Sequence, residues 1–247
     1  AHMVGLGKFL DRHGYQNRFE ILNRHLGRVT EIAKKYGFTP HMWSDMFFRL
    51  AAGGDYYAKG VHIPESVRRQ VPESVELAYW DYYHTDETVY DEMIAAHKEF
   101  GRGIWFAGGA WEWHGFSPNV RFTEQTMRPA MQSVMKNGID NVLITMWGDN
   151  GSECPRFSLL QSLYEIRRYA DGCFDGKTIA ADFEKLFGVS AADFDTLALP
   201  DVIPGETTGA PNPCKALLYN DPFLGILDVA AASVPEIPYA AYAAQLA

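Results

Sequence analysis

Four short apolar segments, separated by helical patterns, constrain the fold of this sequence more than any other feature. Each segment is rich in β-branched or aromatic residues, which predicts buried strands at residues 39–43, 75–80, 104–109 and 141–147. Around and between them, apolar residues recur every three or four positions, which predicts helices at residues 17–36, 88–100, 123–137 and 157–169. Strands that alternate with helices of this length indicate βα units and therefore a parallel sheet in an α/β fold.

The character of the sequence changes near residue 171, where we predict a domain boundary. Residues 1–171 are expected to form a partial (β/α) TIM-type barrel of four βα units, and residues 172–247 a helical C-terminal extension. Within the extension, residues 177–187 have an amphipathic pattern that Gly188 would end. Proline and glycine crowd residues 199–213, which predicts a linker before an apolar tail that resembles a docking helix.

Composition excludes several classes of function. With 31 acidic and 22 basic residues the chain carries a net charge of −9, which would repel nucleic-acid phosphates. No apolar run reaches the roughly 18 residues of a membrane span, so we expect a cytoplasmic protein, with secretion left open. The widely spaced Cys154, Cys173 and Cys214 suggest free thiols rather than a disulfide framework. No ligand spacing or phosphate loop is present, so we expect neither a metal nor a cofactor.

Tryptophans and carboxylates stand together at or just past the carboxyl end of each predicted strand. The groups are Trp43 with Asp45, Trp80 with Asp81, Trp111 and Trp113 with Glu112, and Trp147 with Asp149. In (β/α) barrels this end of the sheet carries the active site. Indole faces cover the apolar face of a sugar ring, while carboxylates accept hydrogen bonds from its hydroxyls. The pattern therefore predicts a sugar pocket, and the alternative is that these tryptophans belong to the barrel core.

Four stretches resemble family 20 of the glycoside hydrolases, most closely the bacterial β-N-acetylglucosaminidases with a helical C-terminal domain. They are Pro40-His-Met-Trp-Ser-Asp-Met-Phe47, Leu77-Ala-Tyr-Trp-Asp-Tyr-Tyr83, Phe106-Ala-Gly-Gly-Ala-Trp-Glu-Trp-His-Gly-Phe-Ser-Pro118 and Thr145-Met-Trp-Gly-Asp-Asn-Gly-Ser-Glu-Cys154. The resemblance covers roughly residues 1–228 and implies a TIM barrel that acts on terminal β-linked N-acetylhexosamine. It also implies a substrate-assisted retaining mechanism, in which the 2-acetamido oxygen attacks the anomeric carbon. In that family an Asp orients the acetamido group and a Glu protonates the leaving oxygen.

The resemblance also assigns sugar-binding roles to residues near the strand ends. The aromatic walls of the family's sugar pocket match Trp43, Trp80 and Trp147, with a further contribution from Trp111 or Trp113. The acids near the distal hydroxyls of the sugar match Asp149 and Glu153. The candidate phenol that would hydrogen-bond the acetamido group is Tyr82 or Tyr83.

The family's Asp-Glu pair lies in a His-x-Gly-x-Asp-Glu motif, which is absent from this sequence. Residues 1–7 match what normally follows that motif, so we expect only barrel strands five to eight here; alternatively, Ala1-His2-Met3 is a cloning scar. Possible surrogate acids are Asp149, Glu112, Asp45 and His114. Asp149 is the first choice, since Glu112 would point away from its flanking tryptophans in an extended segment. Asp45 could instead cap a helix.

Two functions follow, together with one expectation about assembly. The first is a β-N-acetylhexosaminidase acting on terminal N-acetylglucosamine. The alternative is a catalytically impaired carbohydrate-binding remnant or gene fragment that lacks the acid. Four parallel strands alone would leave two open edges and a bare interior, so we expect a two-fold homodimer whose half barrels face each other.

Overall fold

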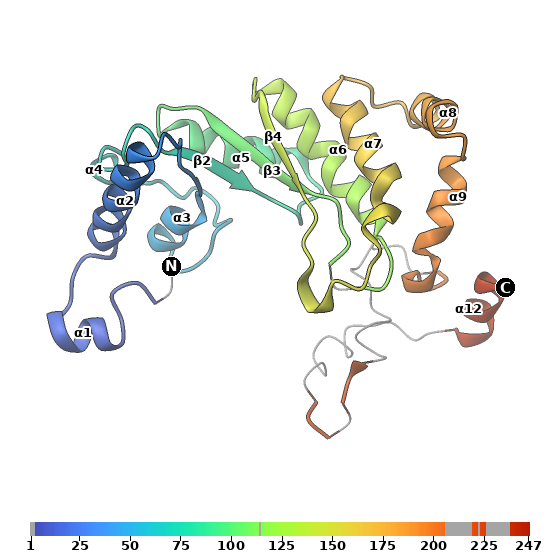
Figure 1. The fold of residues 1–247 in the computed structure, drawn as a ribbon, viewed down its shortest axis with the longest axis horizontal. Helices are drawn as coiled ribbons and strands as arrows, with labels where there is room; N and C mark the ends of the chain where they lie inside the picture. The colour runs from blue at the N-terminus through green and yellow to red at the C-terminus, as the bar shows by residue number, and fades with distance from the viewer. Residues whose placement is uncertain (1–2, 114, 206–218, 222, 226–237) are drawn as a thin grey trace. The chain divides into compact units, whose positions relative to one another are not determined.

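The computed structural model describes residues 3–113, 115–205, 219–221, 223–225 and 238–247 (Figure 1). The strands are β1 (His41–Trp43), β2 (Glu76–Trp80), β3 (Ile104–Gly109) and β4 (Asn141–Thr145). The helices are α1 (Lys8–His13), α2 (Arg18–Lys35), α3 (Asp45–Ala51), α4 (Glu65–Arg68), α5 (Glu87–Lys98), α6 (Val120–Lys136), α7 (Leu160–Ala170), α8 (Gly176–Phe187), α9 (Ala191–Asp195) and α12 (Tyr239–Leu246). Three 3₁₀ turns are η1 (Asp149–Gly151), η2 (Arg156–Leu159) and η3 (Thr196–Asp201).

The four strands form one parallel sheet in the order β1-β2-β3-β4 (Figure 1). Trp43 of β1 lies opposite Ala78, and Trp80 of β2 lies opposite Ala107. Helices α3 and α4 connect β1 to β2, α5 connects β2 to β3, and α6 connects β3 to β4. The predicted α/β class and the alternation of strands with helices are therefore confirmed.

Local signals in the sequence explain where the predicted helices begin and end. The Asn17 side chain accepts a hydrogen bond from the Phe19 backbone N–H at 2.9 Å and so caps α2. Gly188 ends α8 with a left-handed φ of 72°, a conformation that costs glycine little. Of the predicted linker, residues 206–213 lie outside the described part of the chain, as does Cys214.

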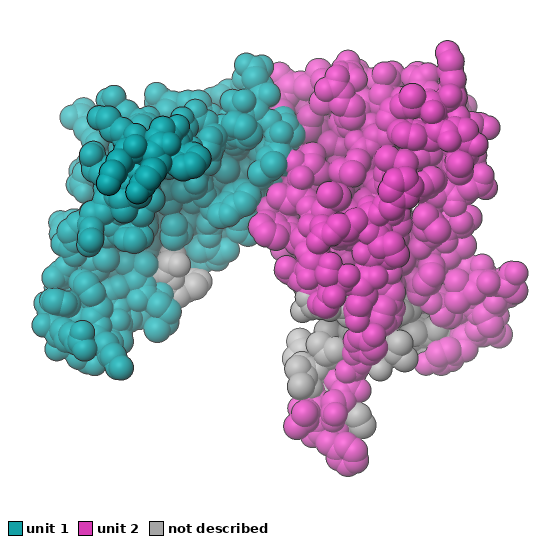
Figure 2. All heavy atoms as spheres, viewed as in Figure 1, with its two compact units in different colours: residues 1–81, 87–107, 136–143 teal, residues 82–86, 108–135, 144–247 magenta. Residues whose placement is uncertain are grey.

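The chain divides into two compact units, shown in different colours in Figure 2. Unit 1 contains residues 1–81, 87–107 and 136–143, and unit 2 contains residues 82–86, 108–135 and 144–247. The predicted boundary after residue 171 falls inside unit 2 and stays a prediction. No helix in the described ranges is both long and apolar enough to cross a membrane.

One face of the sheet forms the core of unit 1. Tyr79 of β2 and Phe106 of β3 are both fully buried, with ring centroids 5.5 Å apart. Tyr90 and Ile94 of α5 are likewise buried, and the Tyr90 ring lies 6.1 Å from that of Phe106. Because strand side chains alternate between faces, Ala78 belongs to the opposite face of the sheet.

A buried histidine ties α5 to the loop that follows β1. His97 is 1% exposed, and its Nδ1–H donates to the Met93 carbonyl at 2.6 Å. Its Nε2 is therefore the acceptor for the Ser44 hydroxyl, also at 2.6 Å, and Ser44 Oγ lies 3.1 Å from the Tyr56 hydroxyl. The Phe48 ring stacks on the imidazole at 4.4 Å. Burial in this aromatic environment lowers the pKa of His97 from 6.5 to about 4.

This histidine predicts an acid-sensitive fold. Between pH 6.5 and 4 the unfolded chain binds a proton at this position and the folded chain does not, so the free energy of unfolding falls as the pH falls. The loss reaches roughly 3 kcal/mol, since each unit of pKa difference corresponds to about 1.4 kcal/mol. Urea unfolding of wild type and His97→Gln between pH 6.5 and 4 measures the free energy of unfolding of each protein. The difference between their slopes of unfolding free energy against pH is the contribution of His97. Parallel pH profiles for the two proteins would contradict the assignment.

Candidate functional site

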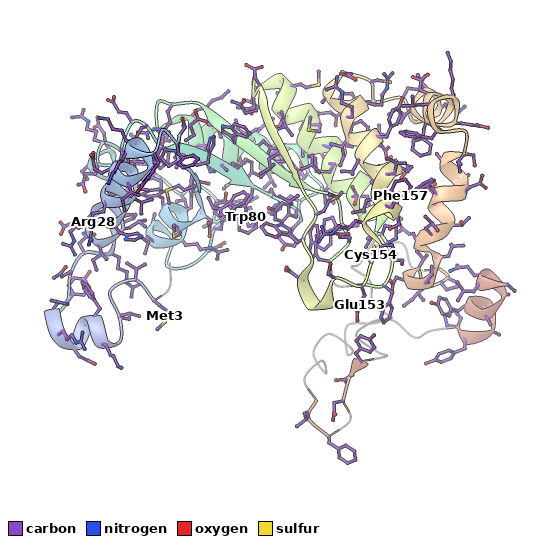
Figure 3. The ribbon with its side chains drawn as sticks, in the orientation of Figure 1. Met3, Arg28, Trp80, Glu153, Cys154 and Phe157 are labelled. Atoms are coloured by element: carbon purple, nitrogen blue, oxygen red, sulfur yellow. The ribbon has the colours of Figure 1, made fainter. Side chains whose placement is uncertain are left out.

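The structure places the predicted tryptophans at the carboxyl ends of neighbouring parallel strands. Trp43 and Trp80 are the last residues of β1 and β2, and Figure 3 labels Trp80 at that position. Trp111 and Trp147 follow β3 and β4, each two residues past the end of its strand. Their surroundings differ between the units, so each unit is described separately.

In unit 2, two of the tryptophans are packed as core. Trp111 and Trp113 are 1% and 3% exposed, and their rings stack at 4.1 Å. The indole N–H of Trp111 donates to the Tyr82 carbonyl at 2.8 Å, and the Tyr82 ring contacts Trp113 edge-on. A Cβ atom on Gly109 would lie only 2.7 Å from the Trp113 ring, so this packing needs a glycine there. The faces of these two indoles are covered by protein rather than open to a ligand.

Glu112 points into the protein beside this cluster. Its side chain is 2% exposed, and Arg156 Nη1 donates to its Oε1 at 3.0 Å. The other oxygen, Oε2, is buried and has no hydrogen-bond partner within the described residues. Burial raises the pKa of Glu112, and the positive charge of Arg156 opposes that rise.

The loop after β4 presents polar and aromatic groups on the surface of unit 2. Trp147 is 39% exposed, and Asp149 and Glu153 are exposed as well. The Tyr219 hydroxyl donates to the Glu153 carboxylate, which raises the pKa of Tyr219. Figure 3 shows Glu153 on this loop. A loop that carries a partly exposed indole followed by two exposed carboxylates has the composition that a sugar ring requires.

The side chain of Arg156 holds the shape of this loop. Arg156 Nη1 donates to the Met146 carbonyl at 3.0 Å, as well as to Glu112. Ser152 adopts a left-handed φ of 54°. A Cβ atom at position 148 would lie only 2.8 Å from the Ser152 Oγ, so this turn favours a glycine at Gly148. Arg156 therefore connects the loops that follow β3 and β4.

In unit 1, the remaining candidates have defined neighbours. The Trp80 ring lies 4.9 Å from Tyr56 and 5.8 Å, edge-on, from Tyr57. Asp45 is the first residue of α3 and accepts a hydrogen bond from Arg49 Nε at 2.9 Å. The N-cap position of α3 belongs to Ser44, so the expectation that Asp45 caps a helix is wrong; Asp45 pairs with Arg49 instead, and its place as a candidate acid stays a prediction.

A hollow of about 320 Å³ opens on the sheet face opposite the core of unit 1. Its lining residues are His41, Met42, Trp43, Ala78, Trp105 and Leu143. The indole N–H of Trp105 donates to Glu76 Oε2 at 2.5 Å, and the His41 ring lies edge-on to Trp105 at 4.8 Å. The sequence pattern alone did not single out Trp105, although strand alternation places it on the same face as Trp43.

The described residues contain no group of His, Cys, Asp and Glu that could hold a metal ion. His114 lies outside the described residues, so its place as a candidate acid stays a prediction. Arg156 is the site residue that sequence reasoning missed, since no motif surrounds it. No family model matches the chain, and no curated protein matches it in sequence.

Proposed function

We propose that this chain is a family 20 β-N-acetylhexosaminidase-type glycoside hydrolase that acts on terminal β-linked N-acetylglucosamine. One observation carries the proposal: tryptophans occupy the carboxyl ends of four neighbouring parallel strands, with carboxylates beside them. In barrels of βα units this end of the sheet is where substrates bind. In this proposal, β1 to β4 correspond to strands five to eight of such a barrel.

The proposed reaction makes few demands on the protein, because the substrate supplies its own nucleophile. The 2-acetamido oxygen forms a bond to the anomeric carbon while the glycosidic bond breaks. The leaving oxygen takes up a proton from an acid, and water then opens the oxazolinium intermediate with retention of configuration. The chain must therefore provide an aromatic wall, acceptors for the sugar hydroxyls and one protonated acid.

Residues of unit 2 fit these three roles. Trp147, the most exposed of the strand-end tryptophans, is the proposed aromatic wall, and Asp149 and Glu153 on the same loop are the proposed hydroxyl acceptors. For the acid, burial raises the pKa of Glu112, whereas Asp149 is exposed on the surface. We therefore propose Glu112 ahead of Asp149 as the proton donor.

The alternative function is a carbohydrate-binding protein without hydrolytic activity. One observation favours it: the Glu112 side chain is only 2% exposed, which restricts its access to a glycosidic oxygen. This alternative keeps the aromatic loop and its carboxylates and loses only the chemical step. Sugar binding is therefore common to both functions and is tested first.

Replacing Trp147 by alanine is expected to weaken N-acetylglucosamine binding about tenfold or more, which corresponds to about 1.4 kcal/mol. The reason is that an exposed indole face supplies apolar contact to one face of the sugar ring. Isothermal titration calorimetry of the wild-type chain and the variant measures the change. Phe157→Ala is the matched control, because Phe157 is an aromatic residue that is 76% exposed in η2.

Equal affinities for wild type and Trp147→Ala would remove Trp147 from the site. No detectable binding by the wild-type chain would reject both the hydrolase and the binding protein. If Phe157→Ala weakens binding as strongly as Trp147→Ala, the effect is not specific to the loop after β4.

A further inference from the structure

We propose that Asp201 is a positioning residue for the candidate site: its carboxylate holds the β3 loop in the shape that buries Glu112 beside Arg156. The β3 loop is residues 111–119, all described except residue 114. The inference rests on the proposed function, in which Glu112 is the proton donor. Asp201 is the last residue of η3 and lies in unit 2, as do the loop and Arg156.

Asp201 holds the middle of the β3 loop by three hydrogen bonds to one carboxylate oxygen. Its Oδ2 accepts from the backbone N–H of Phe116 at 2.8 Å and from the backbone N–H of Ser117 at 2.9 Å. The Ser117 hydroxyl donates to the same oxygen at 2.8 Å. Asp201 and Ser117 are 5% and 4% exposed. Hydrogen bonds to a buried carboxylate are strong, and a buried donor that loses its acceptor carries the cost of desolvation.

The two ends of the β3 loop are fixed separately, against the start of α6. The Asn119 backbone N–H donates to the Trp111 carbonyl at 2.9 Å, which closes the loop at its base. The Trp111 backbone N–H in turn donates to Thr123 Oγ1 at 2.9 Å. Asp201 therefore fixes the part of the loop that lies between these ends and includes the segment following Glu112.

Asp201 is itself kept in place by the C-terminal helix α12. The carbonyls at the end of a helix have no partner within that helix. Gln245 Nε2 of α12 donates to the Leu199 carbonyl at 3.2 Å and to the Val202 carbonyl at 2.9 Å, on either side of Asp201 in sequence. These bonds hold the end of η3, so Asp201 can serve as a fixed anchor for the loop.

A buried thiol lies close to both carboxylates. Cys154 is 3% exposed, and burial raises the pKa of its thiol, with further rises from the negative charges of Glu112 and Asp201. Among the described residues, the charged and titratable groups that face Glu112 are Arg156 at 3.0 Å and this thiol. Since burial raises the pKa of Glu112, release of the β3 loop would admit water and lower that pKa toward its ordinary value.

Hydrogen–deuterium exchange of the full chain tests whether Asp201 holds the β3 loop, and it needs no sugar. Asp201→Ala should speed the exchange of peptides covering residues 111–119 by about tenfold or more, because the Phe116 and Ser117 amides lose their acceptor. Asp201→Asn should stay close to wild type, since its amide oxygen still accepts. Asp193→Ala is the matched control, at an exposed aspartate on α9, and should leave this exchange unchanged.

Carboxyl NMR of isotope-labelled glutamate tests whether the loop positions Glu112, whose signal is identified by its loss in Glu112→Gln. The pKa of Glu112 should be raised in wild type and in Asp201→Asn, and should fall toward its ordinary value in Asp201→Ala. Both variants lose the charge of Asp201, so a fall confined to the alanine variant reports the lost hydrogen bonds. Ser117→Ala removes only the hydroxyl donor and should lower the pKa by less, which provides a milder variant if Asp201→Ala does not fold.

Hydrolysis of an aryl N-acetyl-β-glucosaminide measures the consequence for the proposed reaction. Asp201→Ala should lower kcat by about tenfold to a hundredfold, the size of effect that a small displacement of a reacting group produces. Because the acid acts in its protonated form, the fall of activity at high pH should move to lower pH together with the pKa of Glu112. KM should change less, since the proposed sugar contacts lie on the loop after β4.

Unchanged exchange of residues 111–119 in Asp201→Ala would overturn the proposal, because the β3 loop would keep its shape without Asp201. Faster exchange with an unchanged Glu112 pKa would also overturn it, because the loop would then not set the environment of Glu112. Equal effects of Asp201→Asn and Asp201→Ala would contradict a role through hydrogen bonds. A wild-type chain that hydrolyses nothing would reject the hydrolase alone, since exchange and titration are measured without substrate.

Discussion

The Trp111→Ala variant is expected to lose about 3–5 kcal/mol of unfolding free energy, the range typical for removing a buried aromatic side chain. Trp111 is 1% exposed, stacks on Trp113 at 4.1 Å and meets the Phe122 ring edge-on at 4.8 Å. The substitution also leaves the Tyr82 carbonyl without the indole donor that it has at 2.8 Å. Urea unfolding followed by circular dichroism measures the loss.

Trp147→Ala is the control for this prediction, because Trp147 also follows a strand end but is 39% exposed. We expect it to change stability by less than about 1 kcal/mol, as surface substitutions usually do. Similar losses for the two variants would mean that the loop after β4 is also core. A loss below about 1 kcal/mol for Trp111→Ala would mean that the indole pair is not needed to hold unit 2 together.

The helices and strands could be predicted because their signals are local. The apolar repeat of α2 and the cap at Asn17 lie within a few residues of the structure that they specify. Strand ends were less predictable. The predicted segment 141–147 continues past β4, which ends at Thr145. The Thr145 carbonyl accepts the last ladder bond from the Ala110 N–H, whereas the Met146 carbonyl accepts from Arg156. The side chain of Arg156, ten residues away in sequence, therefore binds the first backbone carbonyl past the end of β4.

The roles of the individual tryptophans could not be predicted from their positions along the sequence. Trp111 and Trp147 each stand two residues past a strand, yet one is buried and the other is not. The difference arises from residues remote in sequence, such as Phe122 of α6, whose ring covers Trp111. The same holds for Glu112, whose partner Arg156 is 44 residues away. Periodicity describes one element at a time and does not report which elements meet.

The structure also changes the order of the candidate acids. Sequence spacing favours Asp149, because it lies next but one to Trp147, but Asp149 is exposed in η1. Trp111 and Trp113 stack on each other, and the carboxyl of Glu112 between them in sequence is buried against Arg156; residues 111–113 lie beyond the end of β3, so the expected strand alternation does not apply to them. Since burial rather than proximity to indole raises a carboxyl pKa, the environment of Glu112 suits a proton donor better.

Replacing Glu112 by glutamine is therefore expected to lower the hydrolysis rate of an aryl N-acetyl-β-glucosaminide by about 10²–10⁴-fold, the usual contribution of a general acid. Glutamine keeps an oxygen that can accept from Arg156, so the loop contacts survive while the transferable proton is lost. Glu184→Gln, at an exposed carboxylate on α8, is the matched control and should retain the wild-type rate, whereas Asp149→Asn removes one proposed hydroxyl acceptor and should lower the rate by much less than Glu112→Gln. Because the acid acts in its protonated form, wild-type activity should fall as the pH rises through the raised pKa of Glu112.

The outcomes of this experiment separate the proposed functions. Full activity in Glu112→Gln, with a large loss in Asp149→Asn, would return the proton donor to Asp149. A wild-type chain that binds N-acetylglucosamine but hydrolyses no more than a mock purification would support the binding protein over the hydrolase. In that case Glu112 would act only through Arg156, which it holds 3.0 Å from the Met146 carbonyl. Because glutamine keeps an oxygen that can accept from Arg156, Glu112→Gln would then leave the sugar affinity close to that of wild type.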